Sequence, residues 1–250
     1  MTNDNKYFVA NWKMFGDTNT LNSIKNVVNL SKLRKFKNVK IIYCPPYTLI
    51  SNFVKKLKNT KIDVGAQNCH HSETDGPHTG FINSAMIKNL GCKYVIIGHS
   101  ENRSIGETNS LINKKIKVCL NNKLKILFCI GENLKEKKLK ITKKIINNQL
   151  NQGLKGLKDI KNIIVAYEPV WSIGTGIIPK QKELIENILY IKHLLKRNFK
   201  NNKTIVLYGG SVNSKNVKDL REINQIDGFL VGGASQKAKN FIDIVKKTII

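Results

Sequence analysis

Three segments of the sequence each carry one side chain that could take part in acid–base chemistry. Lys13 lies in ANWKM, His99 in VIIGHSEN and Glu168 in AYEPVWSIGTG. Together, an ammonium group, an imidazole and a carboxylate can remove a proton from carbon, move protons between oxygens and stabilise the anion that forms. The three segments are far apart in the chain, so this chemistry requires a fold that brings them to one place.

Glu168 ends an apolar run and is followed by a segment that we name the lid, residues 169–176. The lid starts with proline, continues with large apolar residues and ends in Gly-Thr-Gly. An apolar lid that closes over a carboxylate excludes water and makes it a stronger base toward a C–H proton. The alternative is a carboxylate that caps or pairs with a nearby lysine.

The segment SENRSIGETNSLINKKIK, which follows His99, predicts a helix with Ser100 as its N-cap and Glu101 in its first turn. The N-terminal end of a helix disfavours imidazolium, so His99 is expected to be neutral and able to donate and accept protons. Lys13 would supply a fixed positive charge for an anionic substrate and a developing enolate. The alternatives are a core histidine bonded to the backbone and a solvated surface lysine.

Two glycine pairs, in YGGSVN and VGGAS, each follow a predicted strand and lead into a predicted helix. Backbone N–H groups without side chains, next to a helix terminus, form a phosphate site, whereas simple turns are the alternative. Nucleotide binding is disfavoured because neither a P-loop lysine nor G-x-G-x-x-G is present. NCHHSETDGPH holds three of the five histidines but lacks metal-ligand spacing, so no metal is expected there.

The elements that must position these residues are short apolar runs separated by helical stretches. Each run is continuous rather than alternating, which is typical of parallel strands covered on both faces. About eight such β-then-α units in 250 residues, without a linker, favour one (β/α)8 barrel domain over residues 1–250, with a doubly wound sheet as the alternative. Helical spacing predicts helices over residues 18–36 and 179–199, the second with Pro179 in its first turn. The predicted strands are residues 7–10, 39–44, 62–66, 94–98, 124–129, 163–167, 204–208 and 228–231.

Polar residues and glycines follow five of these strands directly. In a parallel barrel every strand opens its carboxyl end on the same face, so such residues converge and indicate an active site. They are Asn11 and Lys13, His99 and Glu101, Glu168, Gly209 to Ser211, and Gly232 with Gly233.

The chain is strongly basic, with 43 Lys and Arg against 17 Asp and Glu and a formal charge of +26. Such a charge can indicate a nucleic-acid-binding protein. Only four of the basic residues are arginine, however, and the lysines are spread among Asn and Ile on predicted solvated faces. We therefore expect no nucleic-acid partner, and a positive field that favours an anionic small substrate.

The apolar runs and the cysteines indicate the cellular compartment of the protein. No apolar run approaches the roughly 18 residues needed to span a bilayer, and the N-terminus lacks a signal pattern. The cysteines form no C-x-x-C pair, which favours reduced thiols. We expect a cytoplasmic protein without membrane association. The cysteines are Cys44, Cys69, Cys92, Cys119 and Cys129.

Seven motifs, in this order and at this spacing, resemble the triosephosphate isomerase family: ANWKM, AQN, GHSEN, CIGE, AYEPVWSIGTG, YGGSV and DGFLVGGASQ. The resemblance runs from about Tyr7 to about Ile244. It implies a TIM barrel that interconverts dihydroxyacetone phosphate and D-glyceraldehyde 3-phosphate through an enediolate, in glycolysis and gluconeogenesis. The alternative, another phosphate-binding barrel enzyme, should lack the combination of Lys13, His99 and Glu168 with an apolar lid.

The resemblance also implies the role of each site residue; this enzyme is a standard worked example of acid–base tuning, so these roles are the family's. Glu168 would move the proton between carbons, neutral His99 would act on the oxygens, and Lys13 would stabilise negative charge. Family members need no metal or organic cofactor. Asn11 would orient the substrate, the backbone amides of Gly174, Ser211, Gly232 and Gly233 would hold the phosphate, and Glu101, Cys129 and Tyr208 would support the site.

Three departures from the family pattern concern the homodimer and the lid. Asn102 and Phe81 stand where the family commonly has an arginine and an acid that pair near the dimer contact, so an apolar contact through Phe81 is expected instead. The contact loop, NCHHSETDGPHTGF, is about one residue longer than usual. In the family, the equivalent of Tyr208 bonds the closed lid at the N–H of position 179. Pro179 has no N–H, so we expect a lid less biased toward closure.

Overall fold

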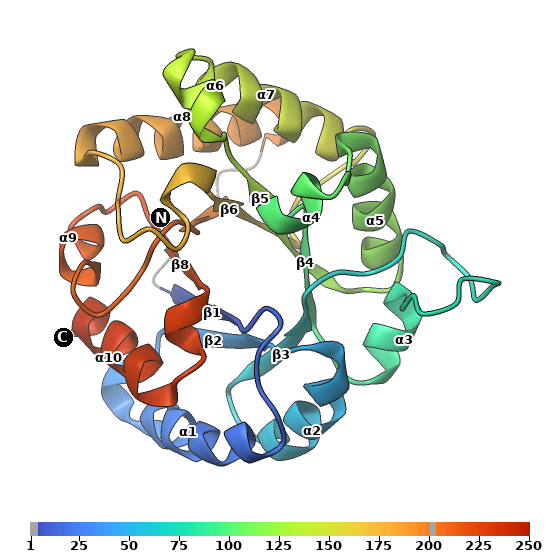
Figure 1. The fold of residues 1–250 in the computed structure, drawn as a ribbon, viewed down its shortest axis with the longest axis vertical. Coiled ribbons are helices and arrows are strands. Elements are labelled where there is room, and N and C mark those ends of the chain that lie inside the picture. Colours follow the sequence, from blue (N-terminus) through green and yellow to red (C-terminus); the bar gives the residue numbers. More distant parts are fainter. Residues whose placement is uncertain (1–4, 201–203) are drawn as a thin grey trace.

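The computed structural model describes residues 5–200 and 204–250, and within them eight parallel strands form a closed barrel in chain order (Figure 1). β8 pairs with β1, which closes the ring. This arrangement confirms the predicted (β/α)8 barrel. The predicted single domain covers residues 1–250, of which 1–4 and 201–203 lie outside the described residues. The strands are β1 Lys6–Asn11, β2 Val39–Cys44, β3 Asp63–Ala66, β4 Tyr94–Ile97, β5 Lys125–Ile130, β6 Ile163–Tyr167, β7 Ile205–Tyr208 and β8 Gly228–Val231.

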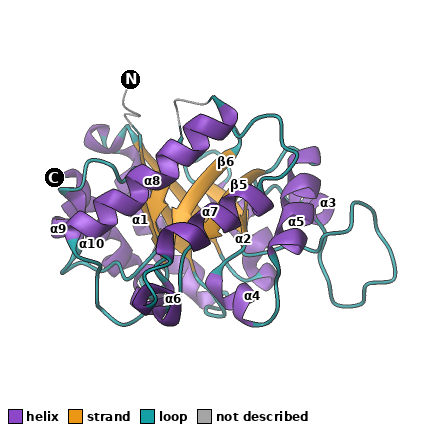
Figure 2. Ribbon diagram, turned by 90° about the horizontal axis from the view of Figure 1, so that it is seen from above, coloured by secondary structure: helices purple, strands orange, loops and turns teal. Residues whose placement is uncertain are grey.

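Every predicted strand agrees with an observed one to within one residue at either end. Helices surround the strands, as both views show (Figures 1 and 2). None of the helices in the described ranges has the length and apolarity that crossing a membrane requires. The α-helices are α1 Ile24–Lys32, α2 Tyr47–Leu57, α3 Ser84–Asn89, α4 Ser100–Ser104, α5 Asn109–Asn121, α6 Leu134–Lys138, α7 Thr142–Gly153, α8 Gln181–Phe199, α9 Val217–Arg221 and α10 Ala238–Ile249, and the 3-10 turns are η1 Asn19–Ser23, η2 Arg34–Phe36, η3 Val170–Ser172 and η4 Gly233–Ser235.

The helical stretches differ from prediction at their ends. The helix predicted over residues 18–36 is divided into η1, α1 and η2, because Leu33 is extended (φ −68°, ψ 136°) and ends α1. Pro179 does not lie in the first turn of α8. That helix begins at Gln181 after the N-cap Lys180, so the proline belongs to the segment that leads from the lid into the helix.

The helix predicted after His99 is also two helices. α4 ends at Ser104, and Gly106 (φ 107°) turns the chain before Thr108 caps α5 by accepting a hydrogen bond from the N–H of Leu111. The predicted N-cap Ser100 is wrong. His99 occupies the cap position instead, and its side chain accepts a hydrogen bond from the backbone N–H of Glu101.

The core has two layers, as expected for strands buried on both faces. One set of strand side chains fills the inside of the barrel, and a larger set packs between the strands and the helices. Because both faces are apolar, continuous apolar runs rather than alternating ones specify these strands. The inner set is Val9, Ile42, Cys44, Tyr94, Ile96, Leu127, Cys129, Ile164, Ala166, Leu207 and Leu230.

One connection stands out from the compact ring. The segment between β3 and α3 projects away from the barrel (Figures 1 and 2). We name residues 68–81 the projecting loop. Its histidine rings lie in tilted contact, with 4.3 Å between the centroids of His70 and His71 and between those of His70 and His78. Phe81 lies against His70 at 4.9 Å. Within the described ranges, no group of three or more His, Cys, Asp or Glu could hold a metal ion.

Closure of the barrel depends on a close approach of backbones at Gly228. Its φ is +155°, and a Cβ there would lie 2.0 Å from the carbonyl oxygen of Tyr7 in β1. We predict that Gly228→Ala lowers the free energy of unfolding by about 3 kcal/mol or more, since the strands must separate. Urea unfolding followed by circular dichroism measures this. Gly76→Ala, where the nearest atom is 3.6 Å away, is the matched control and should change stability little; equal effects of the two variants would contradict the prediction.

Candidate active site

A cavity of about 270 Å³ opens at the carboxyl ends of the strands. Residues that follow β1, β4, β6, β7 and β8 line it, as the convergence argument predicts. The predicted catalytic and substrate-binding residues all belong to this lining. They are Asn11, Lys13, His99, Glu168, Gly174, Ser211, Gly232 and Gly233.

Glu168 is held rigidly at the end of β6. Its backbone N–H donates to the carbonyl of Ile130 (2.7 Å), which continues the pairing with β5 beyond the strand. The side chain is only 2% exposed, and its Oε2 accepts a hydrogen bond from the backbone N–H of Ser100 (3.2 Å). Oε1 is buried and has no hydrogen-bond partner. The carboxylate therefore keeps one acceptor oxygen free beside the cavity.

His99 faces that free oxygen. Its Nε2 lies 3.4 Å from Oε1 of Glu168. Its Nδ1 accepts a hydrogen bond from the backbone N–H of Glu101 (3.2 Å), so Nδ1 carries no proton. This arrangement leaves Nε2 as the ring nitrogen that faces Glu168 and the cavity. The position at the start of α4 provides the N–H group that fixes the tautomer.

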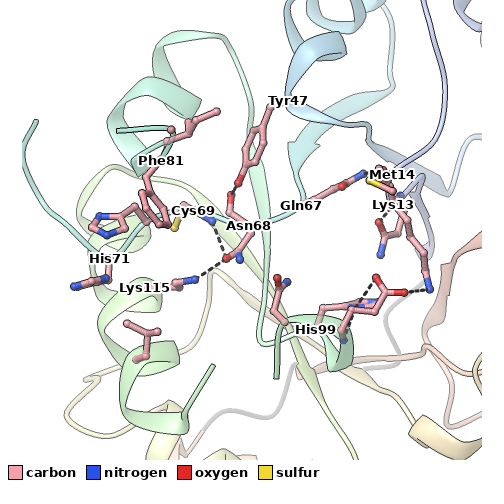
Figure 3. A pocket seen from close by; sticks show the side chains of 17 residues that line it. Lys13, Met14, Tyr47, Gln67, Asn68, Cys69, His71, Phe81, His99 and Lys115 are labelled. Atoms are coloured by element: carbon pink, nitrogen blue, oxygen red, sulfur yellow. Dashed lines mark hydrogen bonds and ion pairs between the residues drawn. The ribbon is translucent and has the colours of Figure 1, made fainter. Parts of the chain in front are cut away.

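Lys13 reaches the cavity through an uncommon backbone conformation (φ 56°) directly after β1. Its backbone N–H bonds Oδ1 of Asn11 (3.1 Å), and Gln67 holds its carbonyl (2.9 Å). The ammonium group donates to Oε1 of Glu101 (2.5 Å), whose other oxygen is 3.6 Å from Nδ1 of His99. Figure 3 shows Lys13 and His99 near one another, with dashed lines for these interactions. Glu101 thus lies between the lysine and the histidine.

Cys129 lies behind the carboxylate on β5. Its thiol is completely buried. Burial, followed by the nearby carboxylate, raises the pKa of the thiol well above its usual value. The thiol is therefore protonated and adds no second negative charge next to Glu168.

The predicted phosphate side of the cavity is built of backbone. Gly233 begins the single turn η4, so its N–H has no partner within the helix. The Ser211 N–H points to Oγ of Ser172 (3.3 Å). One expectation is wrong here: the pair Gly209-Gly210 does not lead into a helix. A loop follows, and α9 begins only at Val217.

The lid is attached to the barrel at two points. Trp171 donates from Nε1 to Glu132 (2.8 Å), and Ser172 Oγ bonds both the Ile177 carbonyl (2.6 Å) and the hydroxyl of Tyr208 (3.0 Å). Beyond Ser172, residues 174–177 are exposed. Tyr208 therefore contacts the lid through a side chain, and not through the backbone of residue 179.

Glu132 is a residue of this site that the sequence argument did not single out. It is fully buried, accepts hydrogen bonds from Trp171 and from the hydroxyl of Tyr167 (3.1 Å), and follows β5 in the motif CIGE. Burial raises its pKa, and those hydrogen bonds act in the opposite direction. It is an acid two residues after a buried strand, close to the signal used for Glu168, which follows its strand directly.

Arg103 was likewise not singled out as a site residue. Its guanidinium donates to the carbonyls of Gly98 (2.7 Å) and Cys129 (3.1 Å) and to Oδ1 of Asn109 (2.6 Å). It therefore ties together the carboxyl ends of β4 and β5, next to His99. Burial lowers its pKa, and the nearby Cys129, Glu107 and Glu168 act in the opposite direction.

A closed parallel barrel with an acid, an imidazole and an amine around one cavity at its carboxyl ends has the architecture of a barrel enzyme for small molecules. The family profile described as triosephosphate isomerase matches residues 6–248. The chain therefore belongs to the triosephosphate isomerase family.

Individual relatives agree with this assignment. A triosephosphate isomerase of Dictyoglomus thermophilum is 42% identical over 248 residues, which cover 96% of this chain and 98% of the relative. One of Neurospora crassa is 39% identical over 250 residues, 98% and 99% of the two chains. The crystal structure of triosephosphate isomerase from Bartonella henselae superposes with a TM-score of 0.88 at 32% identity, covering 97% of this chain and 98% of that one.

The burial of Glu132 predicts a pH-dependent effect on stability. Because its pKa is raised in the folded state, the folded protein binds this proton more tightly, and stability is lost as pH rises from the unfolded toward the folded pKa. Glu132→Gln removes the buried charge while its amide oxygen can still accept from Trp171. We expect the free energy of unfolding of the variant, measured relative to that of the parent, to be higher at pH 8 than at pH 4.

Urea unfolding at both pH values measures this difference. Glu222→Gln, on an exposed side chain, is the control and should show the same difference from the parent at both values. A Glu132→Gln protein whose deficit grows with pH would show that the carboxylate is stabilised in its charged form.

Proposed function

We propose that this chain interconverts dihydroxyacetone phosphate and D-glyceraldehyde 3-phosphate by proton transfer through an enediolate. The observation that carries the proposal is the buried Glu168 carboxylate, whose free oxygen lies 3.4 Å from Nε2 of His99 in one cavity with Lys13. The names of the relatives support the same reaction. The expected place of the reaction is glycolysis and gluconeogenesis.

Each group has a chemical task that its surroundings suit. Oε1 of Glu168 accepts the proton from one substrate carbon and returns it to the other, and burial keeps water from competing for it. The Nε2 proton of His99 polarises the carbonyl oxygen, and Nδ1, fixed by backbone, keeps the ring in that tautomer. The Lys13 ammonium stabilises the negative charge on the enediolate oxygens.

The substrate's phosphate is assigned to the backbone side of the cavity. The N–H groups of Gly174, Ser211, Gly232 and Gly233 would receive it, with Asn11 orienting the sugar. Proton transfer by these side chains requires no metal or organic cofactor, so none is proposed. The free thiols of all five cysteines agree with a reducing, cytoplasmic location.

We further infer a homodimer formed around the projecting loop. Phe81 is 64% exposed and Met14 98% exposed, and both line a second cavity of about 590 Å³ beside the first. Lys13 and His99 lie at one end of this cavity and Phe81 at the other (Figure 3). Burial of these apolar side chains in a partner supports association. The single-domain organisation over residues 1–250 stays a prediction.

Glu168→Asp should lower kcat by about 100-fold or more, because the shorter side chain withdraws the carboxylate from the substrate carbon. Glu168→Gln, which cannot accept the proton, should lower it further. A coupled isomerase assay on both triose phosphates measures this, with thermal unfolding to show that the fold is kept. Glu222→Asp makes the same change far from the cavity and should leave kcat unchanged. A Glu168→Gln enzyme of near-normal turnover would exclude the proposed reaction.

Asn102→Arg alone should not tighten the dimer, since no acid stands at position 81 to pair with the new charge. Phe81→Glu alone should weaken the dimer by losing apolar contact and burying a charge. The double variant should recover part of that loss by forming the pair. Sedimentation equilibrium gives the three dissociation constants. Marked tightening by Asn102→Arg alone would contradict the inferred apolar contact.

A further inference from the structure

Two of the five cysteines lie with their sulfur atoms together. The Sγ atoms of Cys69 and Cys119 are 3.3 Å apart, although 50 residues separate them in the sequence. Cys69 stands at the base of the projecting loop, and Cys119 lies on α5. A disulfide bond measures about 2.05 Å, so an approach of little more than about 1 Å would suffice to form one. Within the described ranges no other two sulfurs lie in hydrogen-bonding contact.

Small molecules have a route to this pair. Cys69, 3% exposed, lines the cavity of about 590 Å³, whereas Cys119 is completely buried behind it. Figure 3 shows Cys69 at the cavity next to Phe81 and Lys115. An oxidant that enters the cavity therefore reaches Cys69 first, and Cys119 stands where a second thiol is needed to resolve the product.

One cation, the ammonium of Lys115, lies near the pair. The ammonium of Lys115 bonds Oδ1 of Asn68 (3.0 Å), the residue before Cys69, and forms an ion pair with the buried Glu107. The hydrogen bond with Cys69, then burial, raises the pKa of Cys119, while Lys115 acts in the opposite direction. A cation beside two thiols favours the thiolate that must form during oxidation.

We propose that Cys69 and Cys119 form a reversible redox site, which a peroxide converts into a disulfide. The thiolate of Cys69 attacks one peroxide oxygen, the O–O bond breaks, and hydroxide leaves to give the sulfenic acid. Cys119 then loses its proton and attacks that sulfur; the S–O bond breaks and, with the proton, the oxygen leaves as water. In sum, two thiols and one hydrogen peroxide give one disulfide and two waters.

The bond would fix the base of the projecting loop to α5. Without that bond the junction with α5 depends on polar contacts, from Lys115 to Asn68 (3.0 Å) and from Asn121 to Glu73 (2.9 Å). The Tyr47 hydroxyl of α2 also bonds the Asn68 carbonyl (2.5 Å). In the oxidised protein a covalent bond would attach the projecting loop to α5. The bond would restrict the motion of the loop, which is the surface inferred above to contact a second copy. The redox site does not depend on the proposed reaction. Its route is the cavity at the inferred dimer contact, so an oxidant enters it when a second copy does not cover that cavity.

The test treats the reduced, full-length protein with hydrogen peroxide, blocks remaining thiols with iodoacetamide, and analyses a non-reducing digest by mass spectrometry. We expect loss of two thiols, a peptide cross-linked between residues 69 and 119, and its disappearance after dithiothreitol. Closing a 50-residue loop should also raise Tm by ~5–10 °C over the reduced protein. Cys92→Ser, at a buried cysteine outside the pair, should behave like the parent.

Cys69→Ser and Cys119→Ser should each abolish both the cross-link and the Tm increase. The digest of the wild-type protein tests for the 69–119 disulfide even if a serine variant folds poorly. Absence of the 69–119 peptide from the folded, peroxide-treated protein would overturn the proposal, as would a Tm increase that persists in either serine variant.

Discussion

Burial of one carboxylate at the rim of the barrel is the constraint on which the site depends. Glu168 is 2% exposed, and neighbouring segments approach it without side chains of their own. A Cβ at Gly131 would lie 1.8 Å from the Glu168 carbonyl oxygen, so the backbone after β5 can pass this close only as glycine. A carboxylate kept this far from water depends on the protein for its partners: Oε2 accepts a hydrogen bond from the Ser100 N–H, and Nε2 of His99 lies 3.4 Å from Oε1.

The lid is joined to the same rigid frame by a second buried acid. Glu132 accepts hydrogen bonds from Trp171 of the lid and from the hydroxyl of Tyr167 in β6. Asn187 of α8 donates to the same Tyr167 hydroxyl (2.9 Å). The lid is thus connected to the strand that precedes Glu168 and to the helix that follows the lid. If one side chain of this hydrogen-bonded network moved away, its neighbour would lose a hydrogen-bond partner. The network therefore couples the position of the lid to the barrel.

Strand positions could be read from the sequence because burial on both faces leaves a continuous apolar run, and the parallel order then places the polar residues at one rim. Finer features could not be read this way. Whether His99 or Ser100 caps α4 depends on which side chain reaches the Glu101 N–H, a matter of backbone angles. Glu132 carried a signal close to that of Glu168, but its partners come from elements distant in sequence. The proline at position 179 shows that Tyr208 has no backbone N–H to bond there. It does not show that the Tyr208 hydroxyl bonds the side chain of Ser172 instead.

The order of strands around the ring has a consequence for how the chain acquires its shape. Among the described strands, each pairs with its neighbours in sequence except at the seam between β1 and β8. Seven pairings can therefore form locally as synthesis proceeds, whereas β1 keeps an open edge until residues 228–231 have left the ribosome. Exposure of that edge ends only with the last strand, so the nascent polypeptide carries an edge open to aggregation until β8 pairs with it.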